Sequence, residues 1–283
     1  MTITPSSSTE VEKITLGGET IVLRRVDGHD EYTACEDLQR RIWGEEDIAK
    51  VPLLDMVTAQ ENGGFVLGAF TTDGELAGFV FSFPGVTEHD EVKQCSVLAA
   101  VAPEYQNLGL GFRLKQYQGQ LAAQHGFRLI TWTFDPLSGR NVVFNLNKLG
   151  AVGVDYVVNA YGVGLGLNAG LETDRLLVAW HVPHVPRQRD LGGGTPVNDI
   201  RFSRTGLPVP AWSTTECDDH TVLLKVPWDV YAISSRDREL AISWRHTSRD
   251  LLGGYLARGY RAVGLRVHER GAPPTYVLRR GAL

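Results

Sequence analysis

The chain has 283 residues, of which 43% are hydrophobic and 22% charged, and its formal net charge is -5 at pH 7. This composition is typical of a globular protein with a sizeable core and excludes a disordered or fibrous chain. The acidic balance argues against nucleic acid as a partner. No apolar run reaches the roughly 18 residues of a membrane span, so no membrane contact is expected.

The N-terminal segment, MTITPSSSTEVEK, lacks a basic stretch followed by an apolar one, so we expect a cytoplasmic protein. The three cysteines, Cys35, Cys95 and Cys217, are odd in number and far apart. They form neither a disulfide framework nor a metal-binding motif, and no metal is expected.

Apolar periodicity predicts a strand, two helices and three strands in the first hundred residues. Their expected ranges are residues 20–26, 30–43, 52–60, 65–72, 76–83 and 92–101. Asp73-Gly74 predicts a tight hairpin between the first two of the three strands. A helix, a strand, a helix and two strands are then expected over residues 109–125, 129–134, 141–149, 154–159 and 176–182. This order predicts a mixed α/β (α+β) fold in which a strand-helix-strand unit follows an antiparallel meander.

Composition also predicts the domain boundaries. We expect a flexible N-terminus over residues 1–18, a first domain over 19–183, a Gly/Pro-rich linker over 184–198 and a C-terminal α+β extension over 199–283. Within the extension, a strand, a long helix and a closing hairpin are expected over residues 221–226, 238–258, 260–268 and 275–279. The extension has few elements, so we expect it to pack on the first domain.

The most informative stretch joins an apolar strand to a helix that opens on glycines, at Gly109 and Gly111. Glycines allow backbone N–H groups to approach an anion, and the first turn of a helix favours a phosphate there. A Walker loop would require Gly-Lys-Ser/Thr, which is absent. A dinucleotide fingerprint would require a third glycine at position 114, which is Leu.

Gln106-x-x-Gly109-x-Gly111 resembles the coenzyme A signature of the GNAT (GCN5-related N-acetyltransferase) superfamily, Gln/Arg-x-x-Gly-x-Gly/Ala. The order of elements over residues 20–182 also resembles that family. The segment from Asn141 to Gly150 is similar to a group of predicted GNAT acetyltransferases that carry a C-terminal extension. The resemblance implies a mostly antiparallel central sheet with a splayed strand pair and flanking helices, plus a small C-terminal α+β extension.

The resemblance implies acetyl-CoA as co-substrate, held along one strand and the following loop. The loop would bind the pyrophosphate through Gln106, Asn107, Leu108, Gly109, Leu110, Gly111 and Phe112. The strand would pair with the pantetheine arm through Leu98, Ala99, Ala100 and Val101. Asn141 and Asn145 are expected to contact the coenzyme from the short helix.

In this family an amine attacks the thioester carbonyl directly, often with a Tyr and a Glu moving the protons. Those places fall on Leu146 and near Cys95, neither of which is expected to do this work. The candidates for relocated catalytic groups are Asp135, otherwise a turn residue, and Tyr161, otherwise a packing residue.

The acceptor side is less well defined by the sequence. Trp132 is expected to line the substrate slot or the core. Glu172 and Asp174 would attract an amine, or form an ordinary polar turn.

Three functions remain open at this stage. The first is an N-acetyltransferase acting on a small-molecule or peptide amine. The second is a non-catalytic, regulatory acyl-CoA-binding protein that lacks the proton-transfer groups. The third is a transferase of longer acyl chains. The amphipathic helix at 238–258 would pack on the core, cover the acceptor end of the cleft, or form a homodimer surface.

Overall fold

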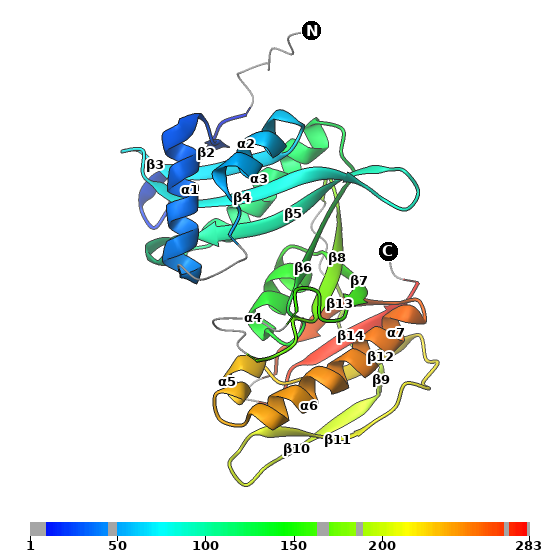
Figure 1. Ribbon diagram of the computed structural model, residues 1–283. Coiled ribbons are helices and arrows are strands. Elements are labelled where there is room, and N and C mark those ends of the chain that lie inside the picture. The colour runs from blue at the N-terminus through cyan, green and yellow to red at the C-terminus, as the bar shows by residue number, and fades with distance from the viewer. Residues whose placement is uncertain (1–9, 45–49, 163–169, 185–188, 269–271, 282–283) are drawn as a thin grey trace. The chain divides into compact units, whose positions relative to one another are not determined.

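The computed structural model describes residues 10–44, 50–162, 170–184, 189–268 and 272–281 (Figure 1). The chain forms two compact units, residues 1–131 with 181–184, and residues 132–180 with 185–283. The division falls inside strand β6 (Leu129–Phe134), after Thr131. Among the described residues, no helix combines the length and apolar character needed to cross a membrane.

The first unit is built on an antiparallel meander. Its strands follow one another in the sheet as β1 (Glu12–Leu16), β2 (Glu19–Arg25), β3 (Phe65–Thr71), β4 (Leu76–Val86) and β5 (Val92–Val101). The predicted hairpin between β3 and β4 is confirmed: the Thr71 amide donates to the Glu75 carbonyl, and Gly74 has a φ of 89°. The first part of β6 then pairs with β5 in parallel.

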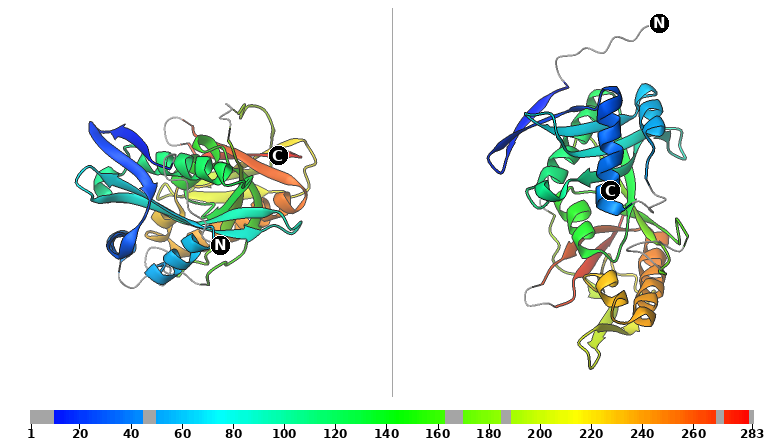
Figure 2. Two further views of the ribbon diagram at one scale, coloured as in Figure 1. Left: turned by 90° about the horizontal axis from the view of Figure 1, so that it is seen from above. Right: turned by 60° about the vertical axis from the view of Figure 1, so that its left-hand side comes forward.

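Helices cover both faces of this meander (Figure 2). Helices α1 (Gly28–Trp43) and α2 (Leu53–Glu61) pack on one face, in a core that includes Tyr32, Met56 and Phe79. Helix α3 (Leu110–Gln124) packs on the other, where Leu114 lies against Gly78 of β4. The predicted helix positions are confirmed because their apolar residues recur at helical spacing and face the sheet.

The second unit contains a sheet in which β8 (Arg175–His181), β7 (Val152–Val157), β13 (Tyr260–Arg266), β14 (Thr275–Arg280), β12 (Thr221–Lys225) and β9 (Thr195–Pro196) are successive neighbours. A separate hairpin is formed by β10 (Asn198–Phe202) and β11 (Pro208–Ser213).

The helical segments of this unit are α4 (Gly139–Val142), the π-helical turn η2 (Val143–Lys148), α5 (Val230–Ser234) and α6 (Arg238–Ser248). The π-helical turn η4 (Arg249–Gly253) and α7 (Gly254–Ala257) continue from α6. The long helix predicted over residues 238–258 is thus present but includes a π-helical turn.

Two predicted boundaries require correction. The N-terminus was expected to be flexible over residues 1–18, yet Glu12–Leu16 pairs with β2, and Ile14 and Leu16 are buried. Residues 1–9 lie outside the described part of the chain.

The predicted linker at 184–198 does not separate the compact units. In the second unit, β7 pairs with β13 from the C-terminal part of the chain. From within the predicted linker, Arg189 donates to the carbonyl oxygens of Gly150, Ala151 and Val263. These contacts hold residues on both sides of the predicted linker in one unit.

We expect Met56→Ala to lower the free energy of unfolding by about 2–5 kcal/mol, because it leaves a cavity beneath α2. Met56 is 0% exposed, whereas Leu54 in the same helix is 70% exposed. Leu54→Ala is the matched control and should change stability by less than about 0.5 kcal/mol. Urea denaturation measures both variants, and equal losses would contradict the core assignment.

Candidate functional site

The site in the first unit begins where β5 stops pairing with β6. The parallel ladder includes Gln94↔Ile130 and Cys95↔Thr131. Beyond Cys95, β5 continues to pair with β4 as far as Val101. Within the described residues of this unit, the other backbone edge of β5 has no strand partner from Ser96 to Val101. Such an edge can accept an extended ligand by added-strand hydrogen bonding.

A short, tightly held loop follows β5. The Ala102 amide donates to the Ala77 carbonyl, and Pro103 opens a single 3-10 turn that ends at Tyr105. The side-chain amide of Gln106 then donates to the Val101 carbonyl over 3.1 Å. The structure therefore gives Gln106 a tethering contact that fixes the loop to the end of β5.

Helix α3 starts abruptly after two residues with positive φ. Asn107 has a φ of 63° and Gly109 a φ of 92°, a left-handed conformation that glycine adopts without strain and asparagine tolerates. The first backbone amides of this helix to donate a hydrogen bond to a preceding carbonyl are those of Phe112 and Arg113, and both donate to Gly109. Among the described residues, no backbone acceptor of standard hydrogen-bond geometry meets the amides from Leu108 to Gly111.

This geometry suits an anion such as a pyrophosphate. The unpaired amides and the positive end of the α3 dipole act together at the helix start. A Cβ built on Gly109 would meet no atom within 4 Å, so the space beside this backbone is open. The loop can thus hold a phosphate group through main-chain donors and needs no lysine to do so.

A buried lysine that the sequence reasoning missed adjoins β5. Lys115 of α3 is 3% exposed, and its ammonium donates to Ser96 Oγ over 3.0 Å and to Gln118 Oε1 over 2.6 Å. Burial lowers the pKa of Lys115 to about 7. Its spacing to Gln118 and Ala122 places it on a buried stripe of the helix, which is the signal that the sequence offered.

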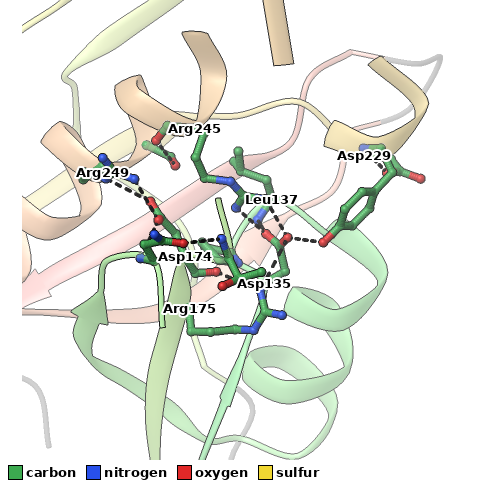
Figure 3. A network of polar contacts seen from close by, with 12 residues as sticks. Asp135, Leu137, Asp174, Arg175, Asp229, Arg245 and Arg249 are labelled. Carbon is green, nitrogen blue, oxygen red and sulfur yellow. Dashed lines mark hydrogen bonds and ion pairs between the residues drawn. The ribbon is translucent and has the colours of Figure 1, made fainter. Parts of the chain in front are cut away.

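The structure gives Asp135 a structural environment in the second unit (Figure 3). Arg245 donates to both carboxylate oxygens over 2.8 Å, and the Leu137 amide and Tyr231 hydroxyl occupy further acceptor positions. Burial alone would raise the pKa of Asp135, but the hydrogen bonds and charge of Arg245 lower it below its ordinary value. A carboxylate so fully engaged is a poor general base.

Asp174 is likewise engaged and 0% exposed. Its oxygens accept hydrogen bonds from Arg249, the Tyr156 hydroxyl and the Asn159 amide. Glu172 accepts from the same Arg249 over 2.5 Å. The prediction that these two carboxylates attract an amine is not supported by this geometry, because Arg249 already occupies both of them.

Three other predicted residues of the second unit, Trp132, Asn141 and Asn145, contact one another. Asn145 accepts from Trp132 Nε1 over 2.9 Å and donates to the Asn141 carbonyl, so it joins β6 to the turn η2. Trp132 packs edge-on against Trp180. Tyr161 is 69% exposed, and its hydroxyl lies 3.3 Å from Thr133 Oγ1, which leaves it accessible.

The two positions at which proton-transfer groups were expected hold none in the structure. Leu146 is fully buried in η2. Cys95 is a free, partly buried cysteine at the last rung of the β5–β6 ladder. Among the described residues, no cluster of His, Cys, Asp and Glu has the arrangement of a metal site.

Comparison with known proteins finds a family match in the first part of the chain. Residues 29–141 match the model of the acetyltransferase (GNAT) family, and these residues include β5, the loop and α3. No curated protein matches the chain.

Similar solved structures include the ribosomal-protein-S18-alanine N-acetyltransferase of Escherichia coli, at 15% identity and a TM-score of 0.46, over 60% of this chain and 99% of that one. Arabidopsis thaliana NAA60, solved in complex with acetyl-CoA, is 12% identical with a TM-score of 0.46, over 57% and 99% of the two chains. A GNAT-family acetyltransferase from Streptococcus pneumoniae is 17% identical with a TM-score of 0.45, over 57% and 99%.

We expect the stability of the protein to rise with pH above about 7 because of Lys115. Its pKa is about 7 in the folded state and about 10.4 in an unfolded chain, so the unfolded chain binds the extra proton between these values. Lys115→Met should remove this rise, which amounts to roughly a few kcal/mol when complete. The measurement is urea denaturation from pH 6.5 to 9.5. Lys13→Met, at an exposed position, is the control and should leave the slope unchanged.

Asp135→Asn should destabilise the protein by about 3–5 kcal/mol, because it leaves the Arg245 guanidinium, 2% exposed, without its counter-charge. Asp218 also pairs with arginines, Arg258 and Arg280, but its side chain is 76% exposed. Asp218→Asn should therefore change stability far less than Asp135→Asn does, because water already screens this exposed carboxylate. Thermal and chemical unfolding of the two variants test this contrast. A small loss in Asp135→Asn would contradict the structural role given to this carboxylate.

Proposed function

We propose that this protein is an acetyl-CoA-dependent N-acyltransferase, whose acyltransferase domain includes the residues 29–141 that match the GNAT family model. The observation that carries the proposal is the loop after β5. The backbone amides at the start of α3 have no backbone acceptor there, and the space beside Gly109 is open. The acceptor would be a small-molecule or peptide amine, which attacks the thioester carbonyl directly.

In this proposal the co-substrate occupies two elements of the first unit. The amides of residues 108–111 bind the pyrophosphate. The free edge of β5, from Leu98 to Val101, pairs with the amide groups of the pantetheine arm as an added strand would. An arm extended along this edge places its thioester toward Ser96, at the end of the β5–β6 ladder.

Positioning then supplies most of the catalysis. Holding amine and thioester together removes much of the entropic barrier, and backbone N–H groups polarise the carbonyl. The nitrogen of the attacking amine must lose a proton, and the departing thiolate must gain one. We propose that Ser96 and Lys115 relay the proton from the amine, since Lys115 adjoins β5 and has a pKa of about 7.

A specific observation also keeps the non-catalytic alternative in view. Asp135 and Asp174 are engaged by arginines, and Leu146 and Cys95 occupy the expected catalytic positions. An acyl-CoA-binding protein without transferase activity would show the same loop. Turnover of acetyl-CoA with a panel of amines, followed by mass spectrometry of the products, separates the two functions. Lys115→Met should bind the coenzyme normally but transfer the acetyl group more slowly.

Gly109→Asp should weaken acetyl-CoA binding at least tenfold, or about 1.4 kcal/mol, because a carboxylate would lie beside the bound pyrophosphate. Gly109→Asn is the matched control, since it adds a side chain of similar size at the same left-handed φ without the charge. It should retain clearly more affinity than the Asp variant. Isothermal titration calorimetry measures both. Equal affinities for the two variants, or no binding by the parent protein, would overturn the coenzyme site.

A further inference from the structure

The second unit contains a cavity that lies outside the candidate coenzyme site. Its volume is about 510 Å³, and its walls include Phe202, Pro208, Trp228, Arg236, Val267 and Pro274. Cavities of roughly 300–1,000 Å³ with mostly apolar walls are typical of small-molecule sites. The size of this cavity therefore fits a compact organic ligand.

Trp228 is the largest side chain in the wall, and the backbone around it is fixed. The Trp228 carbonyl accepts a hydrogen bond from the Gly139 amide over 2.7 Å. The neighbouring residues Ser138 and Asp229 form an isolated antiparallel β-bridge. A Cβ built on Gly139 would lie 2.6 Å from the indole ring, so the ring rests directly on this glycine. The indole is nevertheless 47% exposed, which leaves a large flat apolar surface for a ligand.

Further hydrogen bonds hold the opposite walls. The Val226 amide donates to the Pro274 carbonyl, and Trp244 Nε1 donates to the Pro208 carbonyl over 2.7 Å. Pro208 and Pro274 have restricted backbones of their own. A ligand would thus enter a preformed cavity and lose little free energy to ordering its walls.

The charged groups of the wall indicate the polarity of the ligand. Asp229 is engaged by the amides of Tyr231 and Ala232, as the cap of α5. Arg236 donates to the Thr205 carbonyl over 2.8 Å, and among the described residues it has no carboxylate partner. His268 contacts Thr275 through Nε2. The guanidinium is therefore the group with unused donors for an anion.

We propose that this cavity binds a small aromatic carboxylate, with its ring against Trp228 and its carboxylate on Arg236. A planar ring matches the flat indole surface and the proline walls. A carboxylate matches the fork of the guanidinium and supplies its missing counter-charge. The proposal does not depend on acyl transfer.

The test uses two probes that differ in charge, 2-naphthoate and the neutral 2-naphthylmethanol, titrated into the full-length protein by calorimetry. The parent should bind 2-naphthoate more tightly. Arg236→Gln should weaken 2-naphthoate binding about tenfold and leave the neutral probe unchanged. Arg204→Gln is the matched control on the adjacent hairpin turn, outside the cavity wall, and should leave both affinities unchanged.

A second variant separates binding in the cavity from binding elsewhere. Ala232 lines the cavity but is exposed on α5, so Ala232→Trp should fill the space without unfolding the protein. It should abolish binding of 2-naphthoate while the circular dichroism spectrum stays that of the parent. Absence of 2-naphthoate binding at millimolar concentration, equal affinity for the two probes, or unchanged binding by Ala232→Trp would overturn the proposal.

Discussion

The left-handed backbone at Gly109 is the constraint on which the candidate coenzyme site depends. A residue in helical conformation there would extend α3 toward β5, and its preceding carbonyls would accept the amides that now stay unpaired. The φ values of Asn107 and Gly109 instead turn the chain sharply between β5 and α3. The side chain of Gln106 keeps this turn attached to Val101. The site is therefore made of main-chain donors, and side chains serve mainly to fix the backbone.

The two units bury charged groups in different ways, with different consequences near neutral pH. Asp135 is matched by Arg245 in a two-bond contact, so both groups stay charged in the interior. Lys115 is hydrogen-bonded by the neutral groups of Ser96 and Gln118, and desolvation brings its pKa to about 7. A buried ion pair of the first kind fixes structure. A lysine of the second kind can change its charge near pH 7, and for this reason it is the better candidate for moving a proton.

The elements that could be predicted from the sequence are those defined by residues close together in the chain. The bounds of β5 and β6, Val92–Val101 and Leu129–Phe134, were predicted correctly because apolar residues, glycines and a proline mark them locally. The glycine-opened start of α3 was predictable for the same reason. Strand β1 was missed because only two of its residues, Ile14 and Leu16, are buried, which is too weak an apolar pattern to predict a strand. Its pairing with β2 holds it in the sheet. Hairpin β10–β11 contains prolines that argue against strands, so its pairing was also missed.

The roles of Asp135 and Asp174 were less predictable because each pairs with an arginine that is distant in the chain. The partners of Asp135 and Asp174 are Arg245 and Arg249, 110 and 75 positions away. From the sequence, Asp135 was a candidate catalytic group or a turn residue, and Asp174 was a candidate amine-binding residue or part of a polar turn. Their partners decide the matter, and such pairing is a property of the fold rather than of any local pattern.

The lack of the usual Tyr and Glu does not by itself exclude acyl transfer. General acid–base catalysis contributes about 10²–10⁴-fold to a rate, whereas placing two reactants in one site can contribute about 7–11 kcal/mol of the barrier. In the proposed function, the second contribution comes from the loop and the free edge of β5, which are backbone features of this chain. A protein with Leu146 and Cys95 at the expected catalytic positions can therefore retain most of the rate enhancement. The remaining contribution, removal of a proton from the amine, is the one that the proposed function assigns to Ser96 and Lys115.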